Sequence, residues 1–171
     1  MKLNTSNPGK LEEFKKLFGY ELKSTSIDLR EINSDPESVV AYKAKMAGKG
    51  VLIEDTSLDV EGEDVGINIK WLMSHLKEFI GKKAVWTVLL AMQEDDSILL
   101  WKGEVNGVLV SPRGKAFGFD HYFIPDGREQ TLGESKTNDV SARAVAVSNF
   151  KNGVVFKTLG IPEEWAGEWQ D

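Results

Sequence analysis

The chain has 171 residues and no cysteine, with 41% apolar residues, 28% charged residues and a formal net charge of −6. This composition is ordinary for a soluble globular protein, and the length suits one domain over residues 1–171 better than two independent ones. Disulfides, thiolate nucleophiles and cysteine-based metal centres are excluded, and the acidic balance argues against stable binding to nucleic acid or to an anionic membrane.

Targeting and metal chemistry are also limited by composition. The amino-terminal residues contain no apolar stretch of signal-peptide length, and no segment approaches the roughly 20 apolar residues of a membrane span. We therefore expect a cytoplasmic protein. Since His75 and His121 are the only two histidines, a metal site built from carboxylates is favoured, with Mg²⁺ or Mn²⁺ rather than zinc.

The first elements are expected to be a short strand over residues 1–5 and a helix that ends near Phe18. Asn7 is a good N-cap and Pro8 suits the first helical position. The joint at residues 5–10 combines hydroxyls, backbone N–H groups and Lys10, which are the parts of a phosphate cradle. Ordinary helix capping is the alternative, and the Walker pattern is absent.

A second strand over residues 20–29 and a helix from Asp35-Pro36 to about Lys49 follow. The buried face of this helix is predicted to contain Val39, Val40, Met46 and Ala47. Lys43 lies on the same side of the helix. Its side chain either snorkels to the surface or points into a cleft that binds an anion.

The stretch from Val51 to Gly62 begins as an apolar strand and turns acidic at Glu54 and Asp55. Side chains alternate along a strand, so both carboxylates reach one site only where the strand ends or bulges. We expect Asp55 to point inward, since an Asp beside a strand end is a natural Mg²⁺ ligand. The Thr56 hydroxyl could hold a phosphate oxygen or a metal-bound water, although exposed Ser and Thr residues in turns usually do neither. The alternative is a strand that leaves the core into a solvated loop. Residues 62–68, which are acidic and contain glycine, are expected to form a loop.

The second half of the chain is expected to start with an amphipathic helix over residues 69–80, in which Lys70 opposes the helix dipole. Two long strands, residues 84–92 and 98–110, are joined by a hairpin at residues 94–97. The loop at residues 111–120 mixes glycine, basic and aromatic residues, which suits contact with a flat ligand.

Near the end of the chain, residues 140–147 begin a last helix or strand, with Ser141 as a fair N-cap. Arg143 could hydrogen-bond a carbonyl or phosphate through its planar guanidinium, and ordinary surface charge is the alternative. Phe119 is either a buried core residue or an aromatic ring that stacks on a flat ligand. The tail, residues 154–171, carries no recognisable chemistry.

Several short motifs occur in a fixed order: Thr-Ser-Asn-Pro-Gly-Lys-Leu-Glu-Glu at 5–13, Glu-Asp-Thr-Ser-Leu at 54–58, Ile-Lys-Trp at 69–71, Ser-Pro-Arg-Gly at 111–114, Phe-Gly-Phe-Asp at 117–120 and Phe-Ile-Pro-Asp-Gly at 123–127. In this order and spacing the chain resembles the inosine triphosphate pyrophosphatase family over about residues 3–147. That family hydrolyses non-canonical purine nucleoside triphosphates to the monophosphate and pyrophosphate. The resemblance implies an α/β fold with a long mixed β-sheet and flanking helices that form two lobes around a central nucleotide groove. It also implies magnesium dependence and a homodimer.

The resemblance assigns roles by position. The implied phosphate-binding residues are Thr5, Ser6, Asn7, Lys10, Lys43, Thr56 and Lys70. Glu31 and Asp55 would bind Mg²⁺ with Glu54 in support, and Asp55 or a water on the metal would begin the attack on phosphorus. The implied base-binding residues are Phe117, Gly118, Phe119, Asp120, Ser141 and Arg143.

The chain departs from the family pattern at three positions. Ala142 stands where the family has the histidine of Ser-His-Arg, and His121 stands where it has a proline. Thr137 stands at the usual lysine position, with Lys136 one place before it. Loss of a hydrogen bond to the 6-oxo group would weaken base discrimination by about 1–3 kcal/mol. A pyrophosphatase for pyrimidine or other modified nucleotides, or a catalytically dead nucleotide-binding protein, is therefore an alternative.

Overall fold

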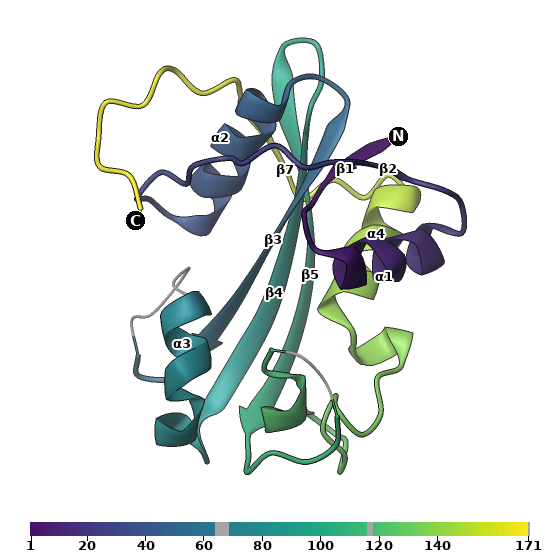
Figure 1. The fold of residues 1–171 in the computed structure, drawn as a ribbon, viewed down its shortest axis with the longest axis vertical. Coiled ribbons are helices and arrows are strands. Elements are labelled where there is room, and N and C mark those ends of the chain that lie inside the picture. Colours follow the sequence, from purple (N-terminus) through teal and green to yellow (C-terminus); the bar gives the residue numbers. More distant parts are fainter. Residues whose placement is uncertain (64–68, 116–117, 171) are drawn as a thin grey trace. The chain divides into compact units, whose positions relative to one another are not determined.

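The computed structural model of the protein describes residues 1–63, 69–115 and 118–170. It has an α/β fold with a mixed sheet (Figure 1), which confirms the predicted α/β class and the predicted mixed sheet. The described strands are β1 Lys2–Asn4, β2 Lys23–Thr25, β3 Val51–Val60, β4 Lys83–Gln93, β5 Ser97–Leu109, β6 Phe123–Pro125 and β7 Lys157–Gly160. The described α-helices are α1 Pro8–Phe18, α2 Pro36–Ala47, α3 Ile69–His75 and α4 Ala142–Lys151. Short 3₁₀ helices cover Leu76–Phe79, Asp120–Tyr122 and Asn138–Val140.

The sheet order is β2-β1-β3-β4-β5-β6, with β7 paired to β5. β1 pairs in parallel with β2 and β3, whereas β5 pairs antiparallel with β6 and β7. The chain forms two compact units. The first contains Met1–Asp55, Leu89–Lys102 and Ala146–Asp171, and the second contains Thr56–Val88 and Gly103–Val145. In the part of the chain that the structure describes, no helix has the length and apolar character needed to cross a membrane.

The beginning of α1 agrees with the prediction from its sequence. The Asn7 side chain accepts hydrogen bonds from the backbone N–H groups of Gly9 and Lys10, at 2.9 and 3.2 Å. Pro8 occupies the first helical position, and Gly19 ends the helix in the left-handed conformation with φ 79°. Local capping chemistry is therefore sufficient to fix both ends of this helix.

Strand β2 is much shorter than the predicted strand over residues 20–29. It contains only Lys23–Thr25, because the side chain of Asn4 replaces the backbone ladder beyond that point. Asn4 Oδ1 accepts a hydrogen bond from the Ile27 N–H at 2.9 Å and another from the Thr25 hydroxyl at 2.9 Å. An asparagine that binds the backbone of a neighbouring strand ends the pairing there.

Helix α2 begins as predicted, with Asp35 accepting a hydrogen bond from the Ser38 N–H at 3.1 Å. The prediction for its buried face was correct for Val39 and Val40 but wrong for Met46, which is 36% exposed. The other buried residues of the helix are Ala41, Tyr42 and Ala44, and its two buried alanines belong to a core cluster of the first unit. The cluster contains Val40, Ala41, Ala44, Ile53, Leu89, Ala91, Ile98 and Leu100. Alanine lets the helix backbone approach the strands closely, so Met46 is not needed to fill this space.

Two further predictions are settled by the strands. β3 runs without a break to Val60, so the alternative of a solvated loop after Ile53 is wrong. The hairpin between β4 and β5 is confirmed, with Glu94 donating its N–H to the Ser97 carbonyl at 2.9 Å.

The predicted helix over residues 69–80 is α3 followed by a 3₁₀ turn to Phe79. Residues 64–68 of the predicted loop lie outside the described residues.

Gly107 in β5 is expected to be intolerant of any side chain. A Cβ atom there would lie 2.4 Å from the Ile124 carbonyl oxygen and 2.5 Å from the Phe123 ring of the paired strand β6. Gly107→Ala should therefore lower the free energy of unfolding by about 2–3 kcal/mol in urea titrations. Gly160→Ala is the matched strand control, because a Cβ at Gly160 meets nothing within 4 Å. Equal unfolding midpoints for the two variants would contradict this prediction.

Candidate active site

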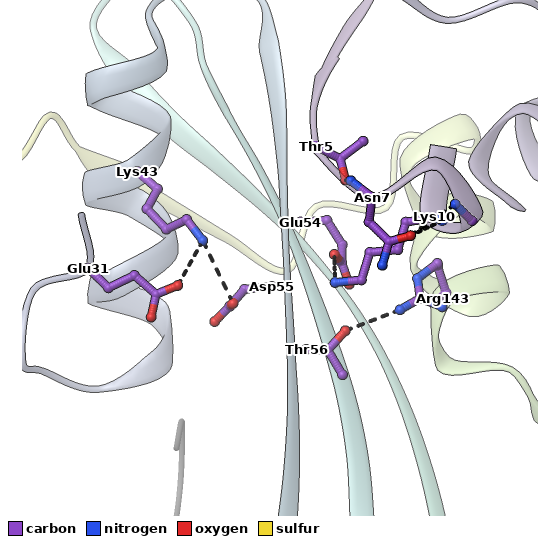
Figure 2. Close-up of polar contacts among 10 residues, drawn as sticks. Thr5, Asn7, Lys10, Glu31, Lys43, Glu54, Asp55, Thr56 and Arg143 are labelled. Atoms are coloured by element: carbon purple, nitrogen blue, oxygen red, sulfur yellow. Dashed lines mark hydrogen bonds and ion pairs between the residues drawn. The ribbon is translucent and has the colours of Figure 1, made fainter. Parts of the chain in front are cut away.

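Strand β3 separates the two neighbouring carboxylates of the acidic stretch. Because the strand is regular at Glu54 and Asp55, their side chains lie on opposite faces (Figure 2). Glu54 Oε2 lies 3.0 Å from Lys10 Nζ, and only 5% of the Glu54 side chain is exposed. Glu54 therefore faces α1, whereas Asp55 faces α2, and the two do not converge on one point.

On the Asp55 face, one lysine is shared by two carboxylates. Lys43 Nζ of α2 lies 3.1 Å from Glu31 Oε1 and 3.9 Å from Asp55 Oδ1. These residues come from three segments of the first unit, as Figure 2 shows. The Lys43 and Asp55 side chains are mostly buried, so the lysine does not snorkel to the surface. The prediction that Lys43 points toward an anionic site is consistent with this geometry.

The Asp55 carboxyl of this cluster has a strongly raised pKa. Burial raises the pKa of Asp55 to about 7, against the opposing effect of the Lys43 ammonium. The carboxylates of Glu54 and Glu31 raise it further. The cluster thus contains more negative charge than the lysines neutralise, and an additional cation would stabilise the ionised form of Asp55.

The chemistry of the donor set fits magnesium. Within the described ranges, no cluster of three or more His, Asp or Glu residues has the arrangement of a complete metal site. However, Mg²⁺ is commonly bound by one or two carboxylates, with waters and substrate phosphates as the other ligands. Glu31 and Asp55 supply such a pair of hard oxygen donors beside one ammonium group.

The predicted phosphate cradle at residues 5–10 serves the chain's own helix in this structure. Asn7 Oδ1 accepts hydrogen bonds from the N–H groups of Gly9 and Lys10. Asn7 donates its own N–H to the Thr5 hydroxyl at 3.1 Å. Ser6 is exposed. The capping alternative therefore describes the observed contacts, and a phosphate would have to displace Asn7 Oδ1 to bind these amides.

In the second unit, Arg143 and Ser141 lie at the beginning of α4. Arg143 is 4% exposed, and its guanidinium donates to the Thr56 hydroxyl at 3.3 Å (Figure 2). It lies 5.9 Å from the centre of the Trp86 ring. Ser141 caps the helix as predicted, because its Oγ accepts a hydrogen bond from the Ala144 N–H at 3.1 Å. Arg143 is thus a buried, oriented donor and not a surface charge.

A second pair of the same unit includes a residue that was not among the predicted site residues. Asp120 is 8% exposed, and its Oδ2 lies 3.0 Å from Lys136 Nζ. Lys136 is one place away from the lysine of the family pattern, yet its side chain reaches the aspartate that the pattern predicts as a base contact. A lysine one position before the expected one was the sequence signal for this contact. The flexible side chain of Lys136 compensates for the shift of one residue.

Phe119 is 6% exposed and packs edge-on against Trp86 and Phe123, at ring distances of 5.6 and 6.0 Å. It therefore belongs to an aromatic cluster, as the core alternative predicts. Gly118 and Lys70 are exposed, Lys70 at the start of α3. Phe117 lies outside the described residues.

Comparison with known proteins shows the family of the chain. A model of the Ham1 family matches residues 1–153. The chain belongs to the Ham1 family. The inosine triphosphate pyrophosphatase of Yarrowia lipolytica is 33% identical over an alignment of 171 residues that covers 86% of this chain and 91% of the relative. The predicted relationship to this group of enzymes is therefore confirmed.

Solved structures of low sequence identity share the fold. A Ham1 protein from Coxiella burnetii has a TM-score of 0.72 and 22% identity, with 90% of this chain and 96% of that chain covered. The Staphylococcus aureus Ham1 protein gives 0.67 and 20%, with 90% and 98% covered. A nucleoside-triphosphatase or dITP/XTP pyrophosphatase from Mycobacterium abscessus gives 0.54 and 23%, with 90% and 97% covered. At these identities the likeness concerns the fold alone.

Proposed function

We propose that this Ham1-family nucleoside triphosphate pyrophosphatase hydrolyses ITP, dITP and XTP to the nucleoside monophosphate and pyrophosphate with Mg²⁺. The reaction would remove non-canonical purine nucleotides from the nucleotide pool. The observation that carries the proposal is the cluster in which Lys43 is shared by Glu31 and Asp55. The names of the Yarrowia lipolytica and Mycobacterium abscessus proteins support the choice of substrates.

The residues of the first unit have complementary roles in the proposal. Mg²⁺ held by Glu31 and Asp55 would neutralise phosphate charge and increase the acidity of the attacking water. Lys43 would turn from these carboxylates toward the anionic substrate, since a triphosphate offers more negative charge. Asp55, once ionised, would orient the water and accept its proton. Lys10, held by Glu54, would contact a phosphate oxygen.

The direct test is incubation of the protein with ITP, XTP, dUTP and ATP in the presence of Mg²⁺, with an assay for pyrophosphate. Fast pyrophosphate release from ITP and XTP is expected. Faster turnover of dUTP would favour the pyrimidine alternative, and nucleotide binding without turnover would favour a dead enzyme. Release of orthophosphate alone would exclude the reaction.

The homodimer is also part of the proposal, and light scattering should give twice the chain mass of 19.0 kDa.

Base selectivity can be tested at Ala142, the first residue of α4, which is fully buried. Ala142→His should raise the preference for ITP over ATP about tenfold, because the imidazole adds a donor for the 6-oxo group. The same change should lower the melting temperature, since the ring must enter a filled position. Ala142→Leu adds comparable bulk without a donor, so its selectivity should stay unchanged. Equal selectivity of both variants would show that another residue reads this edge.

A further inference from the structure

The end of the chain is attached to the segment that carries Glu31. Ile32 and Trp169 form an antiparallel bridge. Gln170 donates its backbone N–H to the Glu31 carbonyl at 2.8 Å, and its side-chain amide donates to the Ile32 carbonyl at 2.9 Å. Asn33 in turn donates its N–H to the Glu168 carbonyl at 2.9 Å. The C-terminal segment, defined as residues 161–170, thus pairs with residues 31–33 through backbone hydrogen bonds in both directions.

Side-chain packing also holds the C-terminal segment against α2 and the segment of Glu31. The Trp169 ring lies edge-on to Tyr42, at 5.7 Å and 78°, and the Arg30 guanidinium lies 4.6 Å from the Trp169 ring centre. Tyr42 is 4% exposed and also accepts a hydrogen bond from the Trp165 N–H at 3.1 Å. Since Tyr42 precedes Lys43 in α2, the C-terminal segment contacts both the segment of Glu31 and the helix that carries its lysine partner.

The segment of Glu31 depends on these contacts. Residues 26–35 connect β2 to α2 and belong to no named strand or helix in the described chain. A connecting segment without its own ladder is free to move unless other groups satisfy its backbone. Here the bonds at Glu31, Ile32 and Asn33 come from the C-terminal segment.

We propose that Trp169 and Gln170 are positioning residues that hold the Glu31 carboxylate beside Lys43 and Asp55. The inference rests on the proposed function, in which Glu31 binds the metal. The Ham1 model matches residues 1–153, so these positioning residues lie beyond the matched part of the chain. The C-terminal segment thereby tunes metal affinity without touching nucleotide or metal.

The test compares the full-length parent, the double variant Trp169→Ala with Gln170→Ala, and Glu164→Gln. Glu164 lies in the same segment and contacts Tyr42 and Lys45 instead of residues 30–33. Hydrogen exchange of residues 28–35 reports on the backbone. Calorimetric titration with Mn²⁺ alone reports on affinity, and pyrophosphate release against Mg²⁺ concentration separates half-saturation from kcat.

The double variant should show faster exchange at residues 28–35, about tenfold weaker Mn²⁺ binding, and a similar increase in half-saturating Mg²⁺. Its kcat at saturating Mg²⁺ should stay near that of the parent, and Glu164→Gln should match the parent throughout. In a Glu31→Gln background, the double variant should cause no further loss of Mn²⁺ affinity.

The inference is overturned by unchanged exchange, by unchanged Mn²⁺ affinity, by an equal loss in the Glu31→Gln background, or by a parent that does not bind Mn²⁺. A parent that binds Mn²⁺ but releases no pyrophosphate would refute the proposed reaction. In that case exchange and Mn²⁺ affinity would still decide whether the segment positions Glu31.

Discussion

Replacing Asp55 with asparagine should reduce pyrophosphate release by about 10³-fold, because the variant loses a metal ligand and the group that accepts the proton of the water. The same change should leave the fold intact and increase its stability above pH 7. The stability effect follows from the raised pKa of Asp55, which is about 7 in the folded protein against an ordinary value of 3.8.

The stability of the metal-free protein depends on pH through the Asp55 carboxyl. Between pH 4 and 7 the folded metal-free protein retains a proton on Asp55 that the unfolded chain has released, so stability falls as the pH rises. Above pH 7 the full cost is reached, up to about 4 kcal/mol at 1.36 kcal/mol per pKa unit. Asparagine carries no charge and avoids this cost. The variant should therefore unfold at higher urea concentration than the parent at pH 8 and at nearly the same concentration at pH 4.

Urea unfolding of the metal-free proteins at pH 4, 6 and 8, together with a pyrophosphate assay, checks both parts of the prediction. Asp59→Asn is the matched control, because Asp59 is an exposed carboxylate on the same strand. It should change neither the rate nor the pH dependence. An Asp55→Asn variant with parental turnover would remove Asp55 from the mechanism, and a variant less stable at pH 8 would show that its ionised form is not penalised.

The second large effect is expected at Lys43. Lys43→Met keeps the length of the side chain but removes the cation shared by Glu31 and Asp55. Turnover should fall about 100-fold because the triphosphate loses a neutralising charge. The free energy of unfolding at pH 7 should fall by about 2 kcal/mol, since two partly buried carboxylates are left without this partner. Millimolar Mg²⁺ should restore part of the stability.

Lys45→Met provides the comparison on the same helix. Lys45 pairs with Glu164, whose side chain is 89% exposed, and such surface pairs contribute at most about 1 kcal/mol. Its loss should affect turnover little. If both lysine variants lost activity and stability to the same extent, the shared contact of Lys43 would have no special role.

The sequence and the structure agree best where the cause is local. Asn7, Pro8 and Gly19 mark the ends of α1 within a few residues of chain, and the alternation of β3 separates Glu54 from Asp55 by geometry alone. The predictions that failed required information from distant segments. Asn4 shortens β2 by binding Ile27, and the small residues of α2 leave Met46 exposed.

By itself, the sequence determined the α/β class, the family and the residue types of the candidate site, because capping, periodicity and motif order are carried by neighbouring residues. Only the tertiary structure showed that Lys43 is shared by Glu31 and Asp55, and that Lys136 reaches Asp120 despite its offset. Only the tertiary structure attached Trp169 to the Glu31 segment, across more than a hundred residues of chain. These contacts depend on packing between distant elements, and no local pattern specifies which side chains will meet.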